Sequence, residues 1–181
     1  ERFNVSISTT VSSTQYHNWS IACTDVFGHE RSTDTKRVTL IVMSNFSGET
    51  TDLGTVNLSK IENLTFERVN SGKIKFSEIV NLSGIDDINK YIKISYNRVE
   101  IDTSTIPILN KSATLYIYNL TYSTTPKIVR DNITCPDTIC KIVSYSNGTL
   151  IFNVSQFSVY TTEEAPTDSG SSGGGSSGGS S

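Results

Sequence analysis

The stretch NGTLIFNVS, from Asn147 to Ser155, gives the clearest structural signal in this chain of 181 residues. Its first two residues, Asn-Gly, are typical of a tight hairpin turn, and a strand pattern follows them. Successive side chains of a strand point to opposite faces of the sheet. We therefore expect one face of this strand to enter a core, with Leu150, Phe152 and Val154 inside and Ile151, Asn153 and Ser155 outside.

The rest of the chain has the composition of a β protein. Leu, Ile, Val, Tyr and Phe dominate its apolar residues, whereas it has only three Ala and one Met. β-branched and aromatic residues favour strands, and alanine favours helices. A second apolar stripe, Tyr116, Tyr118, Leu120 and Tyr122, is predicted to share one strand face. The predicted strands are 3–9, 18–24, 37–43, 60–69, 73–80, 91–101, 112–122, 127–130, 140–145 and 149–161, with one helical turn over 85–91.

Most asparagines of the chain lie in sequons, the triplet Asn-x-Ser/Thr without proline in the middle. The triplet is the acceptor for N-glycosylation, and it holds eleven of the fourteen asparagines. Ser and Thr make up roughly a quarter of the residues before the tail, so random placement would give only about three or four sequons. The eleven predicted glycosylation sites are Asn4, Asn18, Asn45, Asn57, Asn63, Asn81, Asn110, Asn119, Asn132, Asn147 and Asn153.

The middle residue of nine of these eleven sequons is apolar. In a strand, an Asn-apolar-Thr triplet directs the asparagine and the hydroxyl outward and the middle residue into the core. Any alternation rich in Asn, Ser and Thr also produces such triplets, but in smaller numbers. We therefore predict a β-sheet protein whose outer faces carry covalent N-glycans, and we expect no other cofactor.

Three cysteines allow three pairings. Cys135 and Cys140 stand five residues apart in the stretch CPDTIC. A redox or metal pair would need the tighter Cys-x-x-Cys spacing or further ligands. Closing so short a loop adds only about 2 kcal/mol by chain entropy. We predict a Cys135–Cys140 disulfide that stiffens a hairpin loop and leaves Cys23 unpaired.

Other reactive side chains do not form a convincing centre in the sequence. His17 and His29 flank the strand that bears Cys23, which makes a zinc site conceivable, but we interpret both histidines as solvated turn residues. Asp86 and Asp87 fit a turn or a helix cap, and Ca²⁺ would need more oxygen ligands at regular spacing. The sequence has no Gly-x-Ser-x-Gly elbow. We expect no metal site and no enzyme.

The charge of the chain is small and evenly distributed. Fifteen basic and 18 acidic residues give a net charge of −3, without a block of like charge. This gives no reason to expect nucleic acid or an acidic membrane as a partner. The apolar run 38–42 is only as long as one strand, far short of a membrane span. Residues 166–181 are rich in Gly and Ser, as in a flexible linker or tail.

The segment YHNWSIACTDVFGHERSTDTKRVTLIV, residues 16–42, has an aromatic residue, the pattern W-x-x-x-C-x-D, a glycine turn and a long final strand. It resembles the closing strands of the immunoglobulin-like modules of archaeal and bacterial surface proteins. The resemblance implies that residues 1–44 are the last three strands of an incomplete immunoglobulin-like β-sandwich. In such modules the cysteine often bonds to one on an earlier strand, and no cysteine precedes Cys23 here.

Residues 45–165 include the paired-cysteine loop followed by NGTLIFNVSQFSVYT. This unit resembles a module of large archaeal surface glycoproteins, in which a Gly/Ser linker commonly follows. The resemblance implies an extracellular location at the cell surface. The expected fold is all-β: the partial immunoglobulin-like sandwich, a second β-sandwich or jelly-roll-like domain over 45–165, and a disordered Gly/Ser tail.

Two functions fit this sequence. The first is an extracellular structural glycoprotein, a subunit or segment of a surface layer, a filament or pilus, or an adhesin stalk. Its expected partners are identical subunits or other surface proteins. The alternative is a carbohydrate- or host-binding sandwich of a surface or viral spike protein. That function needs an exposed aromatic platform, for which the candidates are Tyr91, Tyr96, Tyr145 and Tyr160.

The first three strands would leave an apolar face uncovered if they stood alone. Burying a side chain such as Val or Leu is worth about 1.5–3 kcal/mol, so an uncovered face forfeits roughly 10 kcal/mol. The cover could be a strand donated by a neighbouring copy in an open filament, upstream residues of the same polypeptide, or the sheets of the second unit. The apolar residues concerned are Val5, Ile7, Trp19, Ile21, Val38, Leu40 and Val42.

Overall fold

The computed structural model describes the backbone of residues 4–11, 16–34, 36–39 and 41–165, and the side chains of residues 21–34 and 41–165. Within these residues the protein is all-β, as predicted, with two single turns of 3₁₀ helix. The elements are β1 (Asn4–Val11), β2 (Tyr16–Thr24), β3 (Glu30–Ser32), β4 (Lys36–Thr39), β5 (Thr65–Arg68), β6 (Gly72–Phe76), η1 (Ile88–Lys90), β7 (Ile92–Ser95), β8 (Arg98–Ile101), η2 (Pro107–Leu109), β9 (Ala113–Ile117), β10 (Lys127–Arg130), β11 (Ile133–Thr134), β12 (Cys140–Ser146), β13 (Thr149–Val154) and β14 (Val159–Glu163).

The first four strands form a separate antiparallel sheet with β2 at its centre. β1 pairs with one edge of β2, and β3 and β4 both pair with the other edge. β3 and β4 are therefore two parts of one interrupted strand. At the interruption, the N–H of Thr33 donates to the carbonyl of Ile21 (2.9 Å), and the Thr33 hydroxyl accepts from the N–H of Ile21 (3.0 Å). The third strand thus begins at Glu30, earlier than the sequence predicted.

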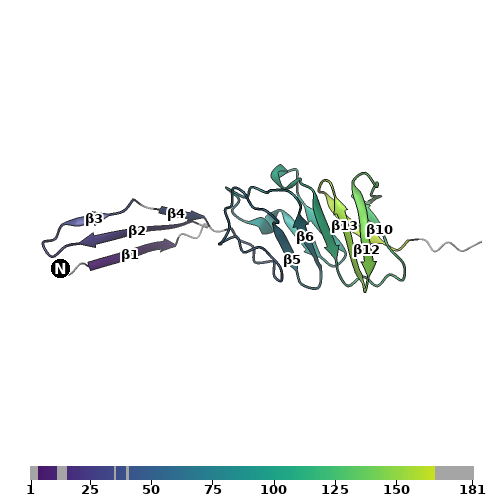
Figure 1. The fold of residues 1–181 in the computed structure, drawn as a ribbon, viewed down its shortest axis with the longest axis horizontal. Helices are drawn as coiled ribbons and strands as arrows, with labels where there is room; N and C mark the ends of the chain where they lie inside the picture. The colour runs from purple at the N-terminus through teal and green to yellow at the C-terminus, as the bar shows by residue number, and fades with distance from the viewer. Residues whose placement is uncertain (1–3, 12–15, 35, 40, 166–181) are drawn as a thin grey trace, which may run out of the picture.

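The other ten strands form a β-sandwich of two five-stranded antiparallel sheets. One sheet has the order β12-β13-β9-β6-β5 and the other the order β11-β10-β14-β8-β7. Figure 1 shows the β1–β4 sheet extending from one side of this sandwich, with β12 and β10 on the opposite side. The N-terminal strands therefore do not add to the sandwich sheets, which was one of the three arrangements that the sequence left open.

The alternation predicted for residues 150–155 is confirmed in β13. Leu150, Phe152 and Val154 are buried, whereas Asn153 and Ser155 are exposed. The predicted tyrosine stripe does not lie on one strand face, because its strand, β9, ends at Ile117 and its buried face consists of Ala113, Leu115 and Ile117.

Tyr116 and Tyr118 instead lie on the outer face of β9. The ammonium group of Lys73 lies 4.3 Å from the centre of the Tyr116 ring. The hydroxyl of Tyr118 donates to a carboxylate oxygen of Glu67 at 2.9 Å. Both aromatic residues on this face therefore have polar partners.

Two predicted strands are each divided by a turn. Range 91–101 is the hairpin of β7 and β8, with Asn97 in the left-handed region (φ +49°) at the turn. Range 149–161 consists of β13 and β14, which belong to different sheets. A break of a few residues between them carries the chain from one sheet to the other.

The residues that join the two units belong structurally to the sandwich. The N–H of Val42 donates to the carbonyl of Asp86 (2.9 Å), and the carbonyl of Val42 accepts from Ile88 (3.0 Å). The ring of Phe46 packs on the ring of Phe66, with centroids 5.0 Å apart. The segment that precedes position 45, assigned from the sequence to the first module, is therefore anchored on the second.

Candidate functional site

Every sequon asparagine whose side chain the structure describes is exposed to solvent. The side chains of Asn4 and Asn18 lie outside the described residues, although both backbones lie in strands of the first sheet. Of the three asparagines outside sequons, Asn70 is also exposed, whereas Asn89 and Asn97 are half-exposed. The nine exposed sites are Asn45, Asn57, Asn63, Asn81, Asn110, Asn119, Asn132, Asn147 and Asn153.

The structural reason for this exposure differs from the predicted one. Of the nine sites, only Asn153 lies within a strand, and the others lie in turns and loops. Four of them, Asn63, Asn119, Asn132 and Asn147, have positive φ values between 49° and 66°. Asparagine tolerates this left-handed conformation better than other residues with a side chain. The strand-face explanation is therefore wrong for most sites, because their asparagines serve as turn residues.

The apolar residue that follows the asparagine still points inward in most sequons. Leu64, Leu82, Leu120 and Val154 are buried, because each sequon carries the chain from an exposed turn or position back into the core. Ile133 is the exception, with 73% of its surface exposed.

At several sites a hydrogen bond holds the amide oxygen and leaves the amide nitrogen free. The Oδ1 atom of Asn57 accepts the N–H of Ser59 at 3.1 Å, and the Oδ1 atom of Asn81 accepts the N–H of Ser83 at 2.8 Å. These are Asx turns, in which the side chain folds over its own backbone. Among the described residues, no hydrogen bond engages the nitrogen, which is the atom that carries the sugar in an N-glycan.

Tertiary contacts hold two further sites in the same way. The Oδ1 atom of Asn110 accepts the N–H of Phe157 at 2.8 Å, and the Oδ1 atom of Asn153 accepts the hydroxyl of Thr114 at 2.8 Å. Both partners are far away in the sequence, so the pattern could not have been predicted from it.

In Asn119 and Asn97, by contrast, the amide nitrogen itself forms a hydrogen bond. The Nδ2 atom of Asn119 donates to the carbonyl of Asn70 at 2.9 Å, so its nitrogen is already engaged. Asn97, outside any sequon, uses both ends of its amide on Thr162: Nδ2 donates to the carbonyl (2.8 Å) and Oδ1 accepts the N–H (2.9 Å). Asn97 therefore has a structural role, which fits its position at the β7–β8 turn.

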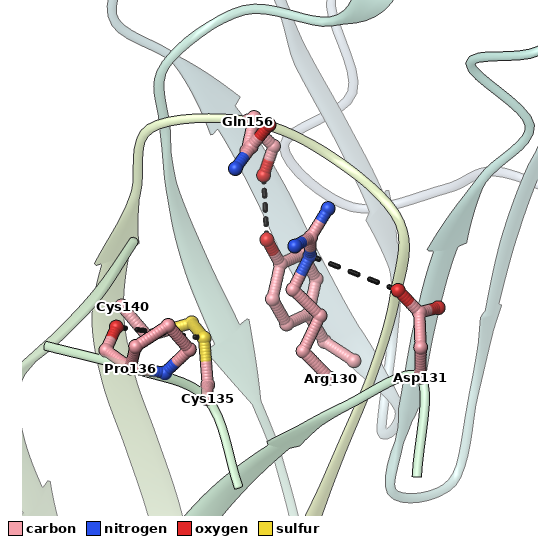
Figure 2. The surroundings of a disulfide bond; sticks show 7 residues. Arg130, Asp131, Cys135, Pro136, Cys140 and Gln156 are labelled. Carbon is pink, nitrogen blue, oxygen red and sulfur yellow. Dashed lines mark hydrogen bonds and ion pairs between the residues drawn. A yellow bond between two sulfur atoms is a disulfide. The ribbon is translucent and has the colours of Figure 1, made fainter. Parts of the chain in front are cut away.

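The predicted disulfide between Cys135 and Cys140 is formed, with the two Cα atoms 5.9 Å apart. Figure 2 shows the bond closing the loop that contains Pro136, with Arg130 and Gln156 on neighbouring segments. Both cysteines are buried, so the loop that joins β11 to β12 is fixed on the core.

The described residues around Cys23 do not form a metal centre; the side chain of His17 lies outside them, and its backbone lies in β2 rather than in a turn. Cys23 is a free thiol, as predicted, and it is half-exposed. His29 donates from Nδ1 to Asp25 at 2.8 Å, and this bond lowers the pKa of the Asp25 carboxyl. In the described part of the chain, no group of three or more His, Cys, Asp or Glu side chains is placed to hold a metal ion.

The paired acidic residues have the capping role that was one of their two predicted uses. A carboxylate oxygen of Asp87 accepts the N–H of Asn89 at 3.0 Å and caps η1. Asp86 forms an ion pair with Lys90 at 3.1 Å, which lowers the pKa of its carboxyl. The predicted helical turn over 85–91 is thus present as η1.

The four candidate tyrosines do not form an exposed aromatic platform. Tyr160 is completely buried, and burial raises its pKa to about 12. Tyr91 and Tyr145 are half-buried, and the hydroxyl of Tyr145 donates to the carbonyl of Tyr122 at 2.8 Å. Only Tyr96 is largely exposed, at 60%. A binding surface made of these residues is therefore not available.

Among the residues that the structure describes, none forms a helix with the length and apolar character needed to cross a membrane.

No model of a known protein family matches this chain, and no curated protein matches it significantly. Among solved structures, it is similar to the C-terminal domain of the nuclear pore complex component NUP116 from Candida glabrata. The identity is 22%, the match covers 57% of this chain and 83% of that chain, and the TM-score is 0.41. A TM-score at this level does not establish a shared fold, so we infer no function from it.

Proposed function

We propose that this chain is an extracellular structural glycoprotein, a subunit or segment of a surface layer, a filament or an adhesin stalk. The observation that carries the proposal is the exposure of all nine described sequon asparagines. Exposed asparagines are common on protein surfaces. The excess of sequons is therefore the second support, together with the bonds that engage the amide oxygens of Asn57 and Asn153 and not their nitrogens.

The disulfide supports an extracellular location. Disulfides persist in oxidising compartments and are rare in the cytosol of most organisms. The sequence resemblance to archaeal surface modules supports the same location. On this proposal the chain acts mechanically, with two successive β units forming a rod that a coat of sugars surrounds.

The first sheet supports assembly as part of the proposal. In the described residues, β1–β4 pair only with one another. A lone sheet leaves one apolar face without cover, so we propose that a strand of a neighbouring copy packs on it. Light scattering of the isolated chain over a range of concentrations tests this step, and a protease-resistant monomer at all concentrations would contradict it.

The glycosylation itself is tested by mass spectrometry of the native protein. We expect most of the eleven sites to carry sugar, including all of those whose amide oxygen is held by a hydrogen bond. Chain produced in a host without N-glycosylation provides the reference mass. Three or fewer occupied sites would overturn the proposal.

A further inference from the structure

One edge strand of the sandwich, β12, has backbone groups free to pair with another strand. β12 is seven residues long and is the last strand of its sheet. Within the described residues it pairs only with β13, so its other side presents unpaired backbone groups. Side chains on both faces of β12 are exposed, including Ile142 at 40% and Val143 at 57%. An exposed apolar edge of this kind is a template for pairing with a second chain.

The surface beside β12 is partly apolar. A hollow lies between β10 and β12, and Ile128, Cys140 and Ile142 line it together with the charged residues Asp137 and Lys141. Ile133, in the edge strand of the other sheet, is 73% exposed. We call β12 together with Ile133 the open edge. Figure 1 shows β12 at the end of the sandwich opposite the β1–β4 sheet.

The corresponding edge at the other end of the same sheet is covered by protein. The N–H of Ser47 donates to the carbonyl of Glu67 (2.8 Å), and the N–H of Thr51 donates to the carbonyl of Thr65 (2.9 Å). The loop that precedes β5 therefore satisfies its outer backbone groups. No comparable segment covers β12 within the described residues.

Three sequons lie around the open edge instead. Asn132 immediately precedes the exposed Ile133, and Asn147 lies in the turn that follows β12. Asn153 is the cross-strand partner of Lys141, the neighbour of Ile142 in β12. All three asparagines are exposed.

We propose that the N-glycans on Asn132, Asn147 and Asn153 cover the open edge and prevent a strand of a second copy from pairing with it. The inference rests on the proposed glycosylation. Neighbouring strands pair at a distance of about 4.8 Å, so a sugar chain anchored beside β12 occupies the volume that an incoming strand needs. A sugar chain also has no continuous row of backbone N–H and C=O groups, so it does not itself extend the sheet.

The test removes sugars without changing the asparagines. The edge variant carries Thr134→Ala, Thr149→Ala and Ser155→Ala, which abolish the three sequons at the open edge. The control variant carries Ser47→Ala, Ser59→Ala and Ser83→Ala, which abolish the sequons of Asn45, Asn57 and Asn81. All proteins keep β1–β4, so association through that sheet would be the same in each. Glycopeptide analysis and light scattering are applied to the full chain.

We expect the edge variant to form larger species at concentrations where wild type and the control variant have equal size. Adding Val143→Lys to the edge variant should restore the smaller size, because a charge on the edge opposes strand pairing. Edge and control variants of equal size would overturn the inference, as would aggregation that Val143→Lys does not relieve. Sugar elsewhere but not at the three edge sites would overturn it while the proposed function stands. A chain largely without sugar would overturn both.

Discussion

Two glycines share a positive φ but differ in the space around them, so comparing them separates the effect of conformation from that of space. Gly148 (φ +71°) follows Asn147 in the β12–β13 turn, and a Cβ atom there would lie 2.6 Å from the carbonyl oxygen of Leu120. Gly84 (φ +85°) has no atom within 4 Å of the same position. The first residue must be glycine for conformation and space, the second for conformation alone.

We expect Gly84→Ala to lower the free energy of unfolding by about 1–2 kcal/mol, the cost of the left-handed conformation. Gly148→Ala should cost about 1–3 kcal/mol more, because the backbone of Leu120 must move. Urea unfolding of both variants measures the difference. Equal losses would show that the turn can shift away from Leu120 at no cost.

The Asp102 carboxylate makes stability depend on pH. Hydrogen bonds from the hydroxyl of Ser104, and then from the hydroxyl and N–H of Thr105, lower the pKa of Asp102 to about 2. A carboxyl with a depressed pKa stabilises the fold above its unfolded value of about 3.9. This contribution is lost as the pH falls through the folded value near 2.

Asp102→Asn also creates the sequon Asn-Thr-Ser, so the comparison uses chains produced in a host without N-glycosylation. There the substitution should lower the urea midpoint at pH 6, and the difference from wild type should shrink towards pH 2. Asp137→Asn, at an exposed position in the disulfide loop, is the control and should shift the midpoint little at pH 6. A difference for Asp102→Asn that stays constant between pH 6 and pH 2 would contradict the electrostatic explanation.

Among the elements, the disulfide loop is the short connection between β11 and β12. Closing so few residues restrains the unfolded chain by about 2 kcal/mol. The double variant Cys135→Ala/Cys140→Ala should lose at least this amount, since both cysteines are also buried. Urea unfolding with and without reductant separates the two effects. Reductant should destabilise wild type and leave the variant unchanged; a response of the variant would point to Cys23 instead.

The elements differ in how well the sequence predicts them. β13 is predictable because Leu150, Phe152 and Val154 alternate with polar neighbours and follow an Asn-Gly turn. The β7–β8 hairpin is missed because its turn at Asn97 lacks the Asn-Gly pair, and the bonds that hold the Asn97 side chain go to Thr162, distant in sequence. Local patterns specify a strand, whereas turns that rely on distant partners leave no local signal.

The same distinction applies to the candidate sites. Exposure of the sequon asparagines is predictable, because an apolar residue such as Leu64 or Leu120 follows and enters the core. Their place in turns is not, since alternation fits a strand equally well. The bond from Phe157 to Asn110 joins residues 47 positions apart and could only be seen in the structure.

At the scale of the whole molecule, we ask whether the stability of each β unit depends on the other. In the described residues, no strand of the β1–β4 sheet pairs with a strand of the sandwich. The sandwich nevertheless needs the residues that connect the units. Val42 exchanges hydrogen bonds with Asp86 and Ile88, and Phe46 packs on Phe66.

A fragment of residues 41–165 should therefore unfold at the same urea concentration as residues 1–165. A fragment of residues 47–165 should be less stable by several kcal/mol. It loses a partly buried aromatic side chain, worth up to about 1.5–3 kcal/mol, and hydrogen bonds worth about 0.5–1.5 kcal/mol each.

The variant Phe46→Ala in the 41–165 fragment measures how much of this stability comes from the Phe46 ring. The rest comes from the backbone hydrogen bonds of Val42 and Asn45. Equal stability of 47–165 and 41–165 would show that the sandwich domain begins at position 47. The contacts of residues 41–46 with the sandwich would then not stabilise it. If 41–165 were much less stable than 1–165, the two units would depend on each other through contacts of the first sheet.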